Sequence, residues 1–149
     1  MVCAVLGAAG GVVMGQPSAQ ERLAQAARLE CRFGAVATGT WGDDDATASV
    51  AVTPSELMAT FSNIDLQRGT AEAEGRLGAS YIVVRYVQGY LHLMQMIDIG
   101  PLYVTTVIAQ ETTDGRLLAV HTRHEFAASS YPEFRERPKM YVGDCAVEH

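Results

Sequence analysis

From residue 30 onward, apolar and polar side chains alternate with a period of two, which is the spacing of β-strands that bury one face. Short segments rich in glycine, proline and aspartate separate the alternating stretches and are typical of turns. The predicted strands are CRFGAVAT (31–38), ASVAVT (48–53), LMATFSNIDL (57–66), GTAEAEGR (69–76), SYIVVRYV (80–87), YLHLMQMI (90–97), LYVTTVIA (102–109), RLLAVHTRHEF (116–126) and MYVGDCAVE (140–148).

The connections between these stretches are tight. Gln88-Gly89 is a two-residue hairpin turn, and Asp114-Gly115 joins two further strands in the same way. We expect Pro54 to interrupt a strand and residues 129–139 to form a polar loop. About eight strands joined in this way predict an all-β fold, an antiparallel meander that closes as a barrel, with a two-sheet sandwich as the alternative.

A short helix and an apolar leader precede the strands. Ser18 and Glu21 have the spacing of a capping box and predict a helix over residues 20–29. The apolar stretch 2–14 is too short to cross a bilayer and predicts a signal peptide over residues 1–19, with a buried N-terminal helix as the alternative. Residues 30–149 then form one β domain, and the protein is expected to be periplasmic or secreted.

Two cysteines lie at the ends of the strand-rich region. Cys3 falls in the predicted leader, so Cys31 and Cys145 remain as a pair in the mature chain. Export favours a disulfide between them, and two free buried thiols are the alternative. Such a bond ties the first strand to the last, as expected of a sheet whose ends meet.

The Gln88-Gly89 turn assigns side chains to two faces, because directly opposite residues share a face. The predicted core face carries Ile82, Val84, Tyr86, Leu91, Leu93, Ile97, Leu102, Val104, Thr106 and Ile108, with Gln95 as its main polar residue. The other face is amphipathic and pairs Arg85 with His92. It supplies the candidate ligand-binding residues Arg85, Tyr90, His92, Met94 and Tyr103. Alternatively, a helix or loop covers this face, or the Tyr and Met side chains form a homodimer interface.

Charge and motif content narrow the function classes. The net charge of −6 disfavours a nucleic-acid partner. No cofactor motif or nucleophile context is present, and no metal site is predicted, because His121 and His124 lie three apart on a strand and therefore on opposite faces. Either histidine could instead join His92, which keeps a small hydrolase or metal-dependent enzyme open as an alternative.

Short motifs resemble a group of small exported bacterial proteins, chiefly of proteobacterial type, for which no function is known. The matching pieces are FSNIDL (61–66) with GTA (69–71), TTV (105–107), AVHTRH (119–124), and Pro138, Tyr141, Gly143 and Cys145. The resemblance implies an exported β-domain that ends in a disulfide cysteine. It draws attention to Asp65 and Arg123, which we expect to form a structural ion pair, with an anion site at Arg123 as the alternative.

These observations lead to one expectation about function. The protein binds a small molecule or a protein partner in the bacterial envelope and has no catalysis of its own. The alternatives are the enzyme that uses His92 with His121 or His124, and a structural envelope protein that dimerises through the Tyr and Met face.

Overall fold

The computed structural model describes residues 16–42, 47–75, 78–96, 101–128 and 134–149, so the predicted signal peptide lies almost wholly outside the described residues. One short helix precedes eight antiparallel strands, as the alternation predicts. The elements are α1 (Ala19–Ala24), β1 (Arg28–Trp41), β2 (Ala48–Asp65), β3 (Thr70–Gly75), β4 (Gly78–Val87), β5 (Tyr90–Met96), β6 (Leu102–Glu111), β7 (Leu117–Ala128) and β8 (Phe134–Glu148).

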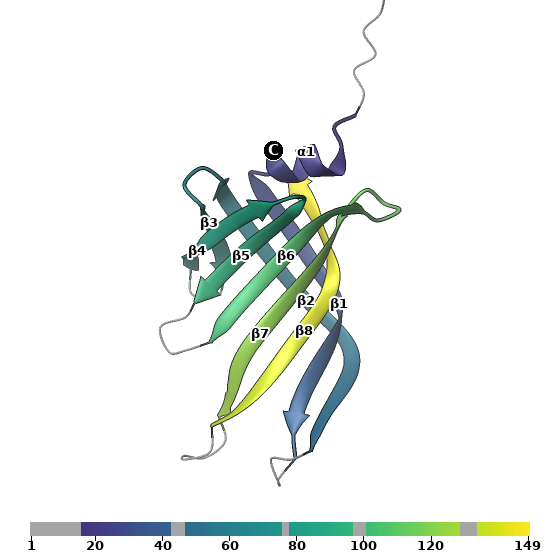
Figure 1. Ribbon diagram of the computed structural model, residues 1–149, viewed down its shortest axis with the longest axis vertical. Helices are drawn as coiled ribbons and strands as arrows, with labels where there is room; N and C mark the ends of the chain where they lie inside the picture. The colour runs from purple at the N-terminus through teal and green to yellow at the C-terminus, as the bar shows by residue number, and fades with distance from the viewer. Residues whose placement is uncertain (1–15, 43–46, 76–77, 97–100, 129–133) are drawn as a thin grey trace, which may run out of the picture.

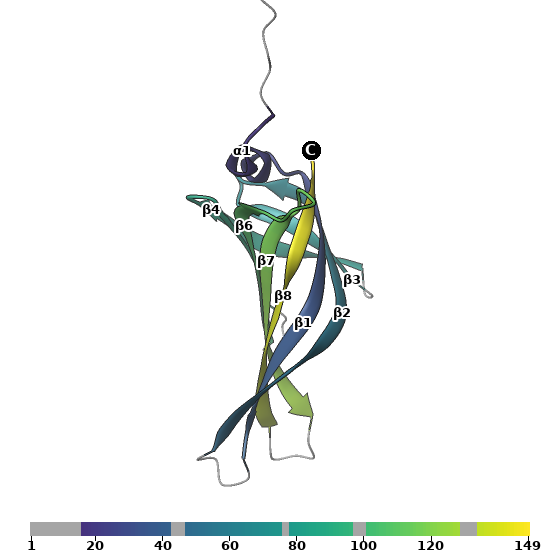
Figure 2. The same cartoon turned by 90° about the vertical axis from the view of Figure 1, so that its right-hand side faces the viewer.

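The eight strands form one closed barrel in sequence order, and β8 returns to pair with β1. This arrangement confirms the barrel and excludes the sandwich. The strands differ in length, from six residues in β3 to 18 in β2. Figures 1 and 2 show the consequence: the β1–β2 and β7–β8 hairpins extend well beyond the short strands at one end of the barrel, and α1 lies across the other end.

Helix α1 closes its end of the barrel. The predicted capping box between Ser18 and Glu21 is formed, and its hydrogen bonds lower the pKa of Glu21. Leu23 is completely buried, and Arg22 donates to Glu111 Oε1 at 2.7 Å and to the Gly115 carbonyl at 2.9 Å. The helix is therefore held both by its apolar face and by the β6–β7 connection.

The helix ends earlier than the sequence predicts. Residues 20–29 were expected to be helical, but α1 ends at Ala24 and β1 begins at Arg28. Ala27 N–H donates to the Glu148 carbonyl, and Leu29 pairs with Phe61 on one side and Val147 on the other. Pairing on both edges outweighs the local helix propensity of this segment.

Two further boundaries differ from the prediction. Strand β2 continues through Pro54. The register between β1 and β2 is irregular next to Pro54, and among the described strands only β1 pairs with this part of β2. A proline is tolerated at such an edge or bulge, since its missing N–H is not needed for the ladder. Residues 134–139, expected to be loop, belong to β8, where Ala128 pairs with Phe134.

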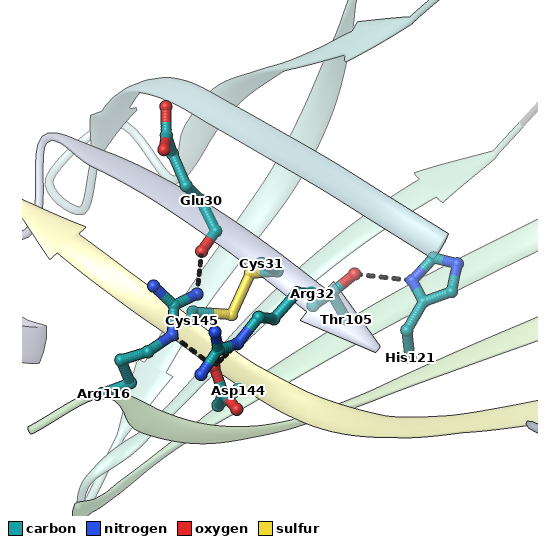
Figure 3. The surroundings of a disulfide bond; sticks show 8 residues. All are labelled: Glu30, Cys31, Arg32, Thr105, Arg116, His121, Asp144 and Cys145. Carbon is teal, nitrogen blue, oxygen red and sulfur yellow. Dashed lines mark hydrogen bonds and ion pairs between the residues drawn. A yellow bond between two sulfur atoms is a disulfide. The ribbon is translucent and has the colours of Figure 1, made fainter. Parts of the chain in front are cut away.

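The first and last strands are joined covalently. Cys31 and Cys145 are direct cross-strand partners with Cα atoms 3.9 Å apart, and they form the predicted disulfide. Figure 3 shows the charged groups around it: Arg32 donates to Asp144 at 2.9 Å, Arg116 also pairs with Asp144, and Arg116 donates to the Glu30 carbonyl at 2.9 Å. The hydrogen bond to Asp144 raises the pKa of Arg32. Covalent and ionic links thus converge on the closure between β1 and β8.

Close packing at this closure depends on Gly143. Phe33 pairs with Gly143 where the β1 register shifts, and its ring is almost completely buried. A Cβ atom at Gly143 would overlap the Arg32 carbonyl oxygen and would lie only 2.7 Å from the Phe33 Cα. Only glycine lets the two backbones approach so closely.

We therefore predict that Gly143→Ala lowers the free energy of unfolding by more than about 2 kcal/mol, because backbone atoms would have to move apart. The matched control is Gly34→Ala, since a Cβ there meets nothing within 4 Å. Equilibrium urea unfolding of both variants tests this prediction. Equal losses in the two variants would contradict it.

The disulfide closes a segment with a sequence separation of 114 residues. Chain entropy predicts that the Cys31→Ala/Cys145→Ala variant is about 4–5 kcal/mol less stable than the oxidised protein. Urea unfolding of the variant, the oxidised protein and the reduced protein measures the difference. The variant and the reduced protein should unfold together; an oxidised protein no more stable than either would argue against closure by the disulfide.

Candidate functional site

The interior of the barrel changes from apolar to polar along its length. On β5 the inward residues run Leu91, Leu93 and Gln95, and on β7 they run Leu117, Ala119, His121 and Arg123. Strands β6 and β8 show the same order, with Val107, Thr105 and Tyr103 on β6 and Cys145, Gly143, Tyr141 and Lys139 on β8. Four neighbouring strands therefore place polar side chains at the same level, away from the end that α1 covers.

A chain of hydrogen bonds runs through this polar level. Thr105 Oγ1 lies 2.7 Å from His121 Nδ1, and Arg123 Nε donates to His121 Nε2 at 2.9 Å. Since an arginine N–H can only donate, His121 Nε2 is the acceptor, so the neutral imidazole carries its proton on Nδ1 and donates to Thr105. The chain holds the Arg123 side chain in a defined place. Figure 3 shows the Thr105 and His121 part of this chain near the disulfide.

Aromatic rings surround the same chain. The Arg123 guanidinium carbon lies 5.1 Å from the Tyr103 ring centroid and 5.3 Å from that of Tyr141. The His121 ring is 5.5 Å from Phe33, 5.7 Å from Tyr141 and 6.1 Å from Tyr103, measured between centroids. Both distances to Arg123 are in the range of cation–π attraction, which adds to the hydrogen bond in fixing its position.

A cavity of about 210 Å³ adjoins these groups. Strands β2, β3, β5, β6 and β7 all contribute to its wall. Phe61 and Leu93 form apolar parts of the lining, and Gln95, Tyr103, His121 and Arg123 form polar parts. His121 is only 5% exposed and Thr105 only 1%, so these two side chains are shielded from solvent, whereas Gln95, Tyr103 and Arg123 are half-buried.

The charges at the cavity are unequal. Arg123 lines it, and Lys139 is the direct cross-strand partner of Arg123 and shares its face. Among the described residues, Glu74 is the one carboxylate in the lining, and Arg28 donates to its Oε1 at 2.6 Å, a bond that raises the pKa of Arg28. Arg123 and Lys139 therefore place two cationic side chains next to each other at this level of the interior.

The five predicted ligand-binding residues do not form one site. Arg85 and His92 are paired as predicted, but their side chains turn in opposite directions along the sheet. Arg85 donates to the Val84 carbonyl and lies over Gly69, on the β3 side, whereas His92 Nδ1 lies 3.0 Å from Thr106 Oγ1, on the β6 side. Tyr90 stacks on His92 and is 46% exposed. Met94 follows on the same outer face of β5.

The structure places Tyr103 on the inner face of β6, whereas the sequence pattern predicted the outer face. Tyr103 pairs with Gln95 and points inward, together with Thr105 and Val107, whereas Leu102, Val104, Thr106 and Ile108 point outward. The prediction reversed this strand because both of its faces are apolar, so the pattern does not specify the register. Leu102 pairs with Met96, so it shares the outer face of Met96 instead of the predicted core face.

The histidines do not support the alternative of an enzyme that uses His92 with His121 or His124. His121 is buried inside the barrel, so it cannot act with His92 on the outer face. His124 does share the outer face, but Val120 is the β7 residue level with His92, and His124 lies four residues further along. Within the described ranges, no group of three His, Cys, Asp or Glu side chains could hold a metal ion.

Asp65 and Arg123 have separate partners, so these two described residues do not form the expected ion pair. Asp65 Oδ1 accepts the N–H groups of Gln67 and Arg68 in the β2–β3 turn, and its other oxygen lies 3.6 Å from the Arg68 guanidinium. Arg123 bonds to His121 inside the barrel. The FSNIDL and GTA motifs thus have a structural explanation. Gly69 adopts positive φ in the β2–β3 turn, and Asn63 adopts positive φ at the register irregularity near the end of β2.

Comparisons with family models, with curated proteins and with solved structures found no match to this chain. In the described part of the chain, no helix has the length and apolar character needed to cross a membrane.

The two threonines of the TTV motif allow a test of the interior chain. Thr105→Val removes the hydroxyl that accepts from buried His121, and we expect a loss of about 1–3 kcal/mol in the free energy of unfolding. Thr106→Val removes the contact to half-buried His92, where water can replace the hydroxyl, and the loss should be below about 1 kcal/mol. Urea unfolding of both variants measures this difference, and equal losses would contradict it.

Proposed function

We propose that the protein binds a small organic molecule inside the barrel and does not itself catalyse a reaction. The observation that carries this proposal is the cavity at the polar level of the interior, which joins apolar walls to an ordered set of polar groups. Binding sites commonly combine these features, because apolar walls supply affinity and a few fixed polar groups supply orientation. An eight-stranded barrel is also of the size that can hold one small ligand.

The cavity limits the size of the ligand. Because a cavity of about 150 Å³ is enough for benzene, a molecule of roughly six to ten non-hydrogen atoms suits the volume observed here. The tyrosine rings beside Arg123 favour a flat molecule. Monocyclic aromatic compounds are therefore suitable probes.

We also propose that this binding takes place in the periplasm or outside the cell. The buried disulfide supports this location, because disulfides persist in oxidising compartments. The predicted leader over residues 1–19 points the same way. The homodimer through the Tyr and Met face stays a prediction; Tyr90 and Met96 are exposed on that face.

Titration of ¹⁵N-labelled protein with phenol, benzamide and benzoate tests the binding function. At least one probe should shift the backbone amide signals of Leu93, Gln95, Tyr103 and Thr105, which lie on two strands of the cavity wall. Ala73→Leu should weaken this binding at least about tenfold, because Ala73 lines the cavity and the larger side chain fills it.

The matched control is Val83→Leu, which enlarges a side chain that is 48% exposed on the outer face. It should leave the titration unchanged. If no probe shifts these amides, or if Ala73→Leu binds the probes as the original protein does, the proposed function is wrong.

A further inference from the structure

We infer that strand β2 carries a docking edge for a second copy of this chain, and that residues 48–53 of the two copies pair as antiparallel strands. The inference goes beyond the proposed binding function, because this edge is separate from the cavity, whose described lining takes only residues 58–61 from β2. It starts from the unequal lengths of two neighbouring strands: β2 has 18 residues, whereas β3 has six.

The longer strand extends past its neighbour and has an edge that no described strand covers. Within the described ranges, β3 pairs with β2 only from Thr60 onward, and residues 48–54 pair with β1 alone. Figure 1 shows this part of β2 along the outer side of β1. In a pair of strands, alternate backbone N–H and C=O groups point away from the partner, so they are available to a further strand.

The side chains of this edge suit a strand partner. Residues 48–53 have the sequence ASVAVT, which contains neither a charge nor a proline. All of them are exposed, and Val50 and Val52, which share a face, are each 71% exposed. An exposed, uncharged strand of this kind is a template for edge-to-edge pairing. Pro54 follows directly and limits the segment, because it has no N–H to donate.

The backbone groups of the edge determine which partner fits. A lipid surface cannot satisfy the N–H and C=O groups of residues 48–53, because hydrocarbon forms no hydrogen bonds with them. A β-strand can satisfy them, and a second copy presents the same edge. Two copies related by a two-fold axis run antiparallel along this edge, so each hydrogen bond from one strand is matched by its equivalent from the other.

The area and the charge of the edge agree with a dimer of moderate affinity. Six exposed residues from each copy bury on the order of 1,000 Å² in total, which lies at the lower limit for a specific interface. The net charge of −6 on each chain opposes association, but residues 48–53 add no like charges to the contact. We expect a dissociation constant on the order of 10 μM.

Sedimentation equilibrium of the oxidised protein between about 1 μM and 1 mM tests the inference, and the average mass should rise from monomer to dimer. Val50→Lys should raise the dissociation constant at least about tenfold, because the two copies would place like charges next to each other across the pair. The matched control is Val87→Lys, which introduces the same charge at a β4 valine that is 56% exposed. It should dimerise as the original protein does.

Hydrogen exchange of the original protein gives a measurement that needs no variant. Alternate backbone amides of residues 48–53 should exchange more slowly at the high concentration than at the low one, because they form hydrogen bonds only in the dimer. The amides of β6, which is paired on both sides, should exchange equally at both concentrations. A parallel sample at the low concentration contains phosphatidylcholine vesicles.

The remaining outcomes would overturn the inference. A monomer at every concentration would contradict it, and a dimer that persists in Val50→Lys would place the interface elsewhere, for example on the Tyr and Met face. Slow exchange of residues 48–53 in a monomer would show that another segment of this chain, such as residues 1–15, covers the edge. Slow exchange that appears only with vesicles would identify a lipid contact. None of these outcomes affects the proposed binding inside the barrel.

Discussion

The pairing of β1 with β8 is the constraint on which the rest of the structure depends. It turns a meander into a ring, and the disulfide between Cys31 and Cys145 together with the ion pairs of Asp144 stabilises it. The ring removes the two edges that an open sheet would expose. It also brings Phe33 on the first strand against His121 and Tyr141 on the last two. An enclosed interior therefore exists only because the ends of the sheet meet.

The two halves of the closed interior differ in composition. The half next to α1 is filled with aliphatic side chains and has the composition of an ordinary core. The other half holds an arginine, a histidine and two tyrosines, which would be costly to bury for stability alone. The hydrogen bonds from Thr105 through His121 to Arg123 offset that cost and fix the geometry. Polar groups held in this way beside a cavity are typical of a binding site.

The amino-acid sequence was enough to predict the barrel, the Gln88-Gly89 hairpin, the capping box and the disulfide. The first three depend on short-range patterns of side chains, and the disulfide depends on the pair of cysteines. The predictions were wrong where the register between two strands determines which face a side chain occupies. Tyr103 was assigned to the outer face because both faces of β6 are apolar, and a shift of one residue reverses the whole strand. Gln95 was predicted to face the core, but its approach to Arg123, and that of Tyr141, was missed because these residues converge only after the ring closes. The one available signal was the change from apolar to polar at alternate positions, as in Leu91, Leu93 and Gln95.

The central claim is that the ligand lies inside the barrel, and intermolecular nuclear Overhauser effects test it most directly. In a complex with benzoate, the ring protons should show these effects to the side chains of Leu93 and Tyr103, which line the cavity. Effects confined to Tyr90 and Met94, on the outer face of the same sheet, would contradict the claim and place the site outside the barrel.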